Sequence, residues 1–197
     1  MPSSSTSTPR TEDTDVPSQE IPTYLYLCVL ESEDSYPFQF DYSLVTGNSS
    51  NKDALVQHKI VDICPCVATE ECGQVGLGYH SNHLIDSSQR VLTLIQLAKV
   101  KNEDLLREVL YRFDPEEHGS SLSWWCWAMD TLVWQNRTGR ILEFSWEYYL
   151  SDVKDVAEDF TYSAIVLGKV VEENGGDKEI PVFDMAMYSQ LPALACR

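Results

Sequence analysis

Residues 119–139, GSSLSWWCWAMDTLVWQNRTG, place the strongest constraint on the fold. They contain four of the chain's five tryptophans, and at helical spacing apolar side chains point in nearly every direction. A helix that is apolar all round must be surrounded by other elements. Serines before the first tryptophan can cap its start, and Gly139 can adopt the left-handed conformation that often ends a helix. The segment therefore predicts the buried central helix of one domain.

The length and hydrophobic content fit one globular domain, with 197 residues of which 43% are hydrophobic. Residues 1–20 consist mostly of Ser, Thr, Pro and acidic residues and contain no aromatic side chain. Such a segment cannot bury enough apolar surface to offset the entropy of ordering it. We expect a disordered acidic tail over residues 1–20 and a single folded domain over residues 21–197.

The charge balance excludes several classes of partner. Thirty-one acidic residues against 14 basic ones give a formal net charge of −17. Phosphate backbones and anionic lipid surfaces both require a basic face, so nucleic acid and membrane partners are not expected. The first residues lack the pattern of a secretory signal, and no apolar run approaches the about 20 residues of a membrane span. We expect a cytoplasmic protein whose six cysteines are mostly reduced thiols.

The remaining chain predicts an α+β fold. Clustered or alternating apolar residues predict strands at residues 24–30, 38–44, 55–63, 90–100, 161–171 and 180–188, with a hairpin at the first pair and a turn-rich link between the last two. Asn102 is expected to cap a helix that runs to about Phe113, and Ser145 to begin an amphipathic helix through Phe160. The result is an antiparallel or mixed sheet packed around the tryptophan-rich helix, with about two further helices.

Three cysteines and two histidines lie close together in a stretch predicted to be largely irregular: Cys64, Cys66, Cys72, His80 and His83. Thiolate and imidazole groups of this kind can hold zinc tetrahedrally. The first two cysteines are separated by a single residue and no CxxC pair follows, which does not fit the common zinc sites. These residues are weak candidates for metal ligands, and thiols near a loop with no metal are the favoured interpretation.

The approach to the tryptophan-rich helix, RFDPEEHGSSLS, is a second candidate for chemistry. A helix start lowers the pKa of a thiol and stabilises an oxyanion, which is why nucleophiles are often found there. Here serines occupy those positions and are more simply explained as caps, and Cys126 is expected to be a packed thiol. Weak catalytic candidates are Tyr24, His118 and Asp130. His58, in a predicted strand, is interpreted as a surface histidine with no role.

The tryptophans themselves are the third candidate. Trp124, Trp127 and Trp134 can line a pocket for a flat apolar ligand. An aromatic stripe at helical spacing is more often simple core, so the two interpretations compete. The chain has no glycine-rich phosphate loop, nucleophile elbow, HExxH motif or dinucleotide fingerprint, so no cofactor is expected.

The order of elements over roughly residues 23–188 resembles a family of small fungal single-domain proteins, a domain of unknown function. The shared features are the opening strand YLYLCVL, a second strand ending in Asp41, a helix closing with YRF, and a glycine-containing link into the tryptophan-rich helix. In that family this helix usually opens with Gly-Cys-Arg-aromatic-Trp and the first strand carries His-Trp, a layout similar to a permuted papain-like arrangement. With Trp125 at the motif's tryptophan, Leu122 takes the cysteine position and Ser121 the glycine position. Tyr-Leu replaces His-Trp, so the resemblance implies that a thiol mechanism is lost here.

Two functional hypotheses follow. The first is a cofactor-independent fungal accessory protein that binds or acts on a hydrophobic small metabolite in an aromatic pocket, for example in secondary-metabolite biosynthesis. The second is a non-catalytic acidic module that engages a basic protein partner. A degenerate cysteine-hydrolase-like protein is a third alternative. Whether the protein is an enzyme stays open at this point.

Overall fold

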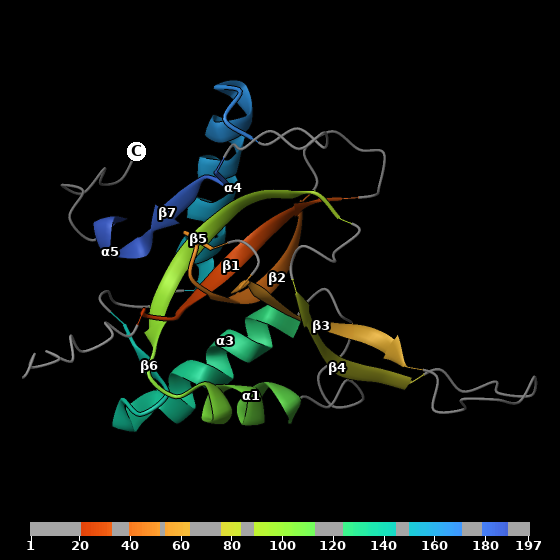
Figure 1. Cartoon of the computed structure of the whole chain (residues 1–197), viewed down its shortest axis with the longest axis vertical. Coiled ribbons are helices and arrows are strands. Elements are labelled where there is room, and N and C mark those ends of the chain that lie inside the picture. The colour runs from red at the N-terminus through yellow and green to blue at the C-terminus, as the bar shows by residue number, and fades with distance from the viewer. Residues whose placement is uncertain are drawn as a thin grey trace, which may run out of the picture.

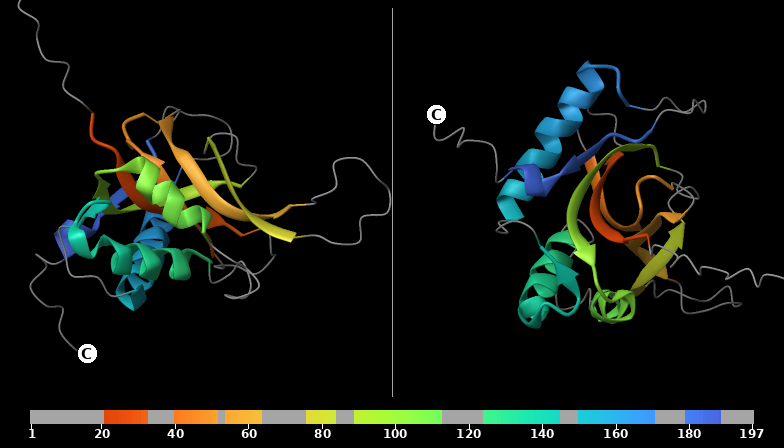
Figure 2. Two further views of the ribbon diagram at one scale, coloured as in Figure 1. Left: turned by 90° about the horizontal axis from the view of Figure 1, so that it is seen from below. Right: turned by 60° about the vertical axis from the view of Figure 1, so that its left-hand side comes forward.

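The computed structural model describes residues 21–32, 40–51, 54–63, 76–83, 89–112, 124–144, 150–170 and 179–188. In these residues a curved mixed sheet carries helices on one face, which confirms the predicted α+β class (Figures 1 and 2). The predicted tail at residues 1–20 lies outside the described residues. Of the helices that are described, none combines the length and hydropathy needed for a membrane span.

The described strands form one sheet in the order β4-β3-β2-β1-β5-β6, with β7 pairing beside β5. Their bounds are β1 Tyr24–Glu31, β2 Phe40–Gly47, β3 Val56–Ile63, β4 Gly76–His83, β5 Val91–Val100, β6 Leu142–Glu143 and β7 Val182–Asp184. β1 pairs antiparallel with both β2 and β5. This confirms the predicted first hairpin and the strands predicted around residues 24–30, 55–63 and 90–100.

The central strand β1 is buried on both faces, and its alternation separates two clusters of side chains. Leu25, Leu27 and Val29 pack under the helices. Tyr26 and Cys28 pack on the opposite face, together with Val45, Leu55 and Leu94. The curvature of the sheet lets its second face enclose a smaller core of its own (Figure 2).

Helix α1, Glu103–Tyr111, begins where the sequence predicts, because the Asn102 side chain accepts a hydrogen bond from the Leu105 backbone amide at 3.0 Å. Its buried face consists of Leu106, Val109 and Leu110. Phe113, the predicted end, lies outside the described residues. α1 follows β5 directly and packs beside the tryptophan-rich helix.

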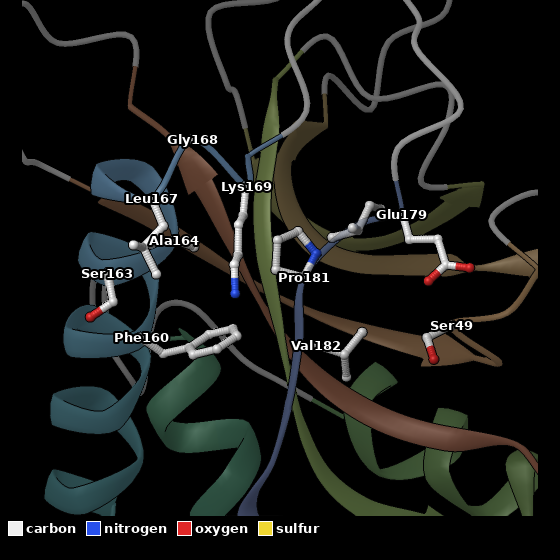
Figure 3. A pocket seen from close by; sticks show the side chains of 11 residues that line it. Ser49, Phe160, Ser163, Ala164, Leu167, Gly168, Lys169, Glu179, Pro181 and Val182 are labelled. Atoms are coloured by element: carbon white, nitrogen blue, oxygen red, sulfur yellow. The ribbon is translucent and has the colours of Figure 1, made fainter.

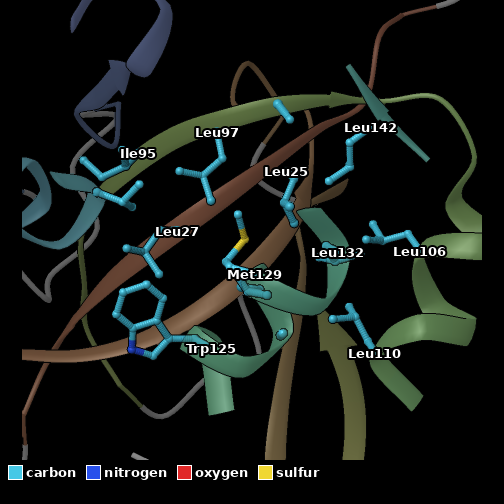
Figure 4. Packing of buried hydrophobic residues seen from close by; sticks show 14 of the residues in the cluster. Leu25, Leu27, Ile95, Leu97, Leu106, Leu110, Trp125, Met129, Leu132 and Leu142 are labelled. Carbon is cyan, nitrogen blue, oxygen red and sulfur yellow. The ribbon is translucent and has the colours of Figure 1, made fainter. Parts of the chain in front are cut away.

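The tryptophan-rich segment forms helix α3, Trp124–Gln135, followed by a 3-10 turn, Asn136–Thr138, and a left-handed Gly139 with φ of 62°. Figure 4 shows the α3 residues Trp125, Met129 and Leu132 between the leucines of β1 and those of α1. The expectation that every side of α3 is covered is wrong. The helix lies between the sheet and the solvent, so Asp130 and Trp134 on its outer side are exposed.

The amphipathic helix α4, Leu150–Val166, extends further than predicted, and the strand predicted at residues 161–171 is wrong. The buried residues Val153, Ala157, Thr161 and Ala164 follow each other at spacings of four, four and three, so the helical pattern continues through this segment. Its β-branched residues suit a strand in isolation, but packing against the sheet selects the helix. The predicted start at Ser145 lies outside the described residues.

Two further segments differ from the sequence-based expectation. Residues 76–83, predicted to be irregular, form strand β4, because antiparallel pairing along the whole of β3 satisfies a glycine-rich backbone at a sheet edge. The segment at residues 180–188 forms the short strand β7 and then one helical turn, α5 Met185–Tyr188. β7 pairs parallel with β5.

Candidate functional site

The three tryptophans predicted to line one pocket have different environments. Trp124 is 3% exposed in the main core, Trp127 is half-buried, and Trp134 is 62% exposed. The Arg137 guanidinium lies 5.2 Å from the centre of the Trp134 ring, on the outside of the molecule. Neither the groove nor the cavity described below contains a tryptophan in its wall. In the described part of the chain, α3 is mainly a packing helix.

The weak catalytic candidates do not converge. Tyr24 packs on the second face of the sheet, whereas Asp130 is exposed on α3, which covers the first face. His118 lies outside the described residues. The sheet itself separates the two candidates that are described.

The predicted metal ligands are only partly described. His80 and His83 belong to strand β4, and Cys64, Cys66 and Cys72 lie outside the described residues. The described ranges contain no cluster of three or more His, Cys, Asp or Glu residues that could hold a metal ion. With three of its five members outside the described residues, the candidate ligand set stays a prediction.

The thiol of Cys126 has no feature of a nucleophile. Partial burial raises its pKa, and the nearby carboxylate of Asp130 raises it further. The thiol is therefore protonated at neutral pH. Cys28 is completely buried in the second core, where loss of hydration raises the pKa of its thiol strongly.

A groove of about 850 Å³ lies between the end of α4 and the chain that enters β7 (Figure 3). Its lining comes from three separate parts of the chain: Ser49, Phe160, Ser163, Ala164, Leu167, Gly168, Lys169, Glu179, Ile180, Pro181 and Val182. This volume is within the roughly 300–1,000 Å³ typical of sites for small molecules. It is larger than the hollow beside α1, which has a volume of about 460 Å³.

The end of α4 is shaped by a helix-terminating turn. Gly168 adopts φ of 64°, its amide donates to the Ile165 carbonyl, and the Lys169 amide donates to the Ala164 carbonyl at 2.9 Å. These two bonds form the Schellman motif, in which a glycine reverses the chain just beyond the last helical turn. The turn directs the Lys169 side chain back across the groove, between Phe160 and Pro181 in Figure 3.

The opposite wall is fixed to the sheet. The Leu94 amide of β5 donates a hydrogen bond of 2.9 Å to the Pro181 carbonyl, and Val182 is then paired with Leu94 in the parallel ladder. At the base, the Phe160 ring packs against Phe183 with centroids 5.3 Å apart. Both walls of the groove are therefore held by backbone hydrogen bonds and ring packing.

The groove combines apolar walls with few charges. Phe160, Leu167 and Pro181 supply apolar surface, and the Lys169 ammonium extends into the hollow between them. In Figure 3 the carboxylate of Glu179 lies on the other side of Pro181 from Lys169. Such a surface suits a ligand with an apolar body and an anionic end. Sequence reasoning missed this site because residues 161–171 were predicted as a strand, although the LGK that follows a helical pattern is a signal for a helix end.

His58 is not the surface residue predicted from its strand. Its side chain is 0% exposed, and its Nε2 lies 2.9 Å from the Thr46 hydroxyl oxygen. Burial, assisted by the nearby guanidinium of Arg107, lowers the pKa of His58 to about 4. The imidazole is therefore neutral at pH 7.

Comparisons with known proteins give no match, whether to a protein-family model, to a curated protein or to a solved structure.

Proposed function

We propose that this protein binds a small hydrophobic metabolite with an acidic group in the groove between α4 and β7. The observation that carries the proposal is the position of one lysine ammonium in a hollow with largely apolar walls. Apolar contact with Phe160, Leu167 and Pro181 supplies most of the affinity. The charge of Lys169 selects a ligand with a carboxylate or a similar anion.

Typical interaction energies support assigning affinity to apolar contact and selectivity to the charge of Lys169. A ligand that buries roughly 150 Å² of apolar surface gains about 4 kcal/mol before the costs of association. An exposed ion pair adds only about 0–1 kcal/mol. Lys169 is exposed, so its contribution to affinity is small. Its effect appears mainly as a preference between charged and neutral forms of the same molecule.

The proposal concerns binding and not catalysis. The polar side chains in the groove wall at Ser163, Lys169 and Glu179 are all exposed to solvent. Nucleophiles and general bases are usually activated by burial or by a tightly bonded partner. The arrangement therefore supports recognition of a ligand by shape and charge, without a cofactor.

Thermal unfolding of the full chain tests the proposal. A panel of aromatic and long-chain carboxylic acids is compared with the methyl esters of the same molecules. At least one acid is expected to raise Tm, because a ligand that binds only the folded state stabilises it by mass action. Its ester is expected to give a smaller shift.

Two variants locate the binding. Lys169→Gln should reduce the shift given by the acid to that given by its ester, whereas Lys99→Gln, an exposed lysine on β5, should leave it unchanged. Val182→Asp places a second negative charge in the groove wall and should abolish the shift. If no acid raises Tm, or if both lysine variants behave alike, the proposal is wrong.

A second candidate, a protein-interaction module, is favoured by a separate observation. Tyr162, Val166 and Leu167 are large apolar side chains exposed near the end of α4, in a chain whose formal net charge is −17. A basic partner should then co-purify in low salt, be released by high salt, and be lost in a Val166→Asp variant. A chain that elutes alone in low salt speaks against this candidate.

A further inference from the structure

A second hollow, of about 460 Å³, lies near the start of α1. Residues 21–23, the connection from β2 to β3, and the first turns of α1 form its walls. Its lining mixes apolar residues such as Pro22, Ala54 and Val56 with threonine, asparagine and serine side chains and two opposite charges. We refer to it as the α1 cavity.

The floor of the α1 cavity carries a buried polar pair. Thr46 is 5% exposed and lines the cavity, and its hydroxyl oxygen lies 2.9 Å from Nε2 of His58, which is 0% exposed. A threonine hydroxyl has one donor and two acceptor positions, so one bond to an imidazole leaves further positions for a ligand. Because His58 is neutral at pH 7, the pair adds no charge to the floor. His58 thus holds the hydroxyl of a residue that lines the hollow.

One wall of the α1 cavity presents two opposite charges. Glu103 and Arg107 are one helical turn apart on α1, and their Oε2 and Nη2 atoms are 3.9 Å apart. The two side chains are 48% and 52% exposed, so their mutual attraction is screened and worth little. Both groups keep unused hydrogen-bonding positions. A ligand with neighbouring positive and negative groups can place its positive group against Glu103 and its negative group against Arg107.

The opposite wall is the turn at residues 48–51, which is held by its own hydrogen bonds. The Asn48 side-chain oxygen accepts a hydrogen bond of 2.8 Å from the Ser50 amide, and the Asn48 backbone carbonyl accepts one of 2.9 Å from the Asn51 amide. The preceding Gly47 has φ of 143°, and a Cβ at this position would lie 2.7 Å from the Ala54 carbonyl oxygen. The wall is therefore a closely packed turn that only glycine permits.

We propose that the α1 cavity is a binding site for a small zwitterion of the amino-acid class. The ligand's ammonium faces Glu103, its carboxylate faces Arg107, and a polar atom bonds to the hydroxyl of Thr46. His58 acts as a positioning residue that orients this hydroxyl. The cavity volume leaves room for the side chain of an amino acid. The paired charges select a zwitterion and disfavour simple anions and simple cations, because each of these would meet a like charge.

Two-dimensional ¹H–¹⁵N NMR titration of the full chain with the standard amino acids at millimolar concentration tests the proposal. At least one is expected to shift the amides of residues 46–51 and 103–107. Arg107→Gln and Glu103→Gln should each weaken its binding by up to about fivefold, since a half-exposed charge pair is worth about 0–1 kcal/mol. The N-acetylated, methyl-esterified form of the same amino acid should not bind.

Matched variants separate the site from the fold. Arg112→Gln removes the equivalent ion pair with Glu108 on the same helix, outside the cavity, and should leave binding unchanged. Thr46→Ser keeps the hydroxyl and should bind nearly as the native chain does, whereas Thr46→Val should bind several-fold more weakly. If Thr46→Val fails to fold, comparing the binding of the Arg107→Gln variant with that of the Arg112→Gln variant still tests the proposal. The proposal is overturned if no amino acid binds, if Arg107→Gln binds normally, or if the shifts map to residues 160–169.

Discussion

Met129 lies at the centre of the contact between α3 and the sheet and is completely buried. Met129→Ala removes about three heavy atoms from this contact, which at ~0.8 kcal/mol each is about 2.4 kcal/mol of lost transfer free energy. A residual cavity of roughly 50 Å³ at ~24 cal/mol per Å³ adds about 1.2 kcal/mol. We expect the free energy of unfolding to fall by about 3.5 kcal/mol.

The matched control is Trp134→Ala on the same helix. Trp134 is 62% exposed, and its most specific contact is the Arg137 guanidinium above its ring. An exposed cation–π contact is worth about 0.5–1 kcal/mol, so this larger truncation should cost no more than about 1 kcal/mol. Urea unfolding followed by far-UV circular dichroism measures both values without relying on tryptophan emission. If Trp134→Ala costs as much as Met129→Ala, the one-sided burial of α3 is refuted.

Three further predictions concern single residues. Because the pKa of His58 falls from its ordinary 6.5 to about 4 on folding, the stabilisation linked to its neutral form is complete above pH 6.5 and is lost as pH falls toward 4, by about 2–3 kcal/mol. His58→Gln should therefore flatten the fall in unfolding free energy between pH 6.5 and 4. An unchanged pH profile would contradict this prediction. Gly47→Ala should cost about 2–3 kcal/mol through the clash with the Ala54 carbonyl, measurably more than Gly139→Ala, whose added Cβ meets no atom within 4 Å; equal losses would refute the close approach. Asn102→Ala removes the α1 cap and should lower the unfolding free energy by about 1 kcal/mol in urea melts, whereas Asn102→Asp, which keeps the accepting oxygen, should not.

Local signals predicted much of the fold. The run from Tyr24 to Leu30 is apolar on both sides, and the structure places it in the middle of the sheet, buried on both faces. Asn102 marks a helix start because its side chain competes for a backbone amide that has no partner inside the helix. Signals of this kind depend only on neighbouring residues, so they can be interpreted without knowing the tertiary contacts.

The misjudged elements depend on contacts between distant parts of the chain. Residues 161–166 have β-branched and aromatic side chains, yet Thr161 and Ala164 extend the buried face of α4 against β5. Thr161 forms a hydrogen bond with Thr93, a residue that is distant in sequence. Once these residues are placed in a strand, the turn that positions Lys169 cannot be predicted.

The candidate sites were harder to predict than the fold for the same reason. The groove joins the end of α4 to the entry of β7, and the α1 cavity joins a strand end to a helix start. A buried histidine and a surface histidine look alike in a strand pattern, since only the packing of α1 distinguishes them for His58. The tryptophans dominate the composition of α3, but their size serves the core at Trp124 and Trp125 more than any hollow.

The turn at residues 48–51 stands between the two hollows. Ser49 lines the groove, whereas Ser50 and Asn51 line the α1 cavity, and the Ser49 amide also donates to the Tyr26 hydroxyl at 3.3 Å. A molecule that shifts this turn changes the shape of the groove and of the α1 cavity together. Thermodynamic reciprocity then requires each occupant to change the affinity of the other by the same factor, so two ligands of unrelated chemistry would report on each other through one short piece of backbone.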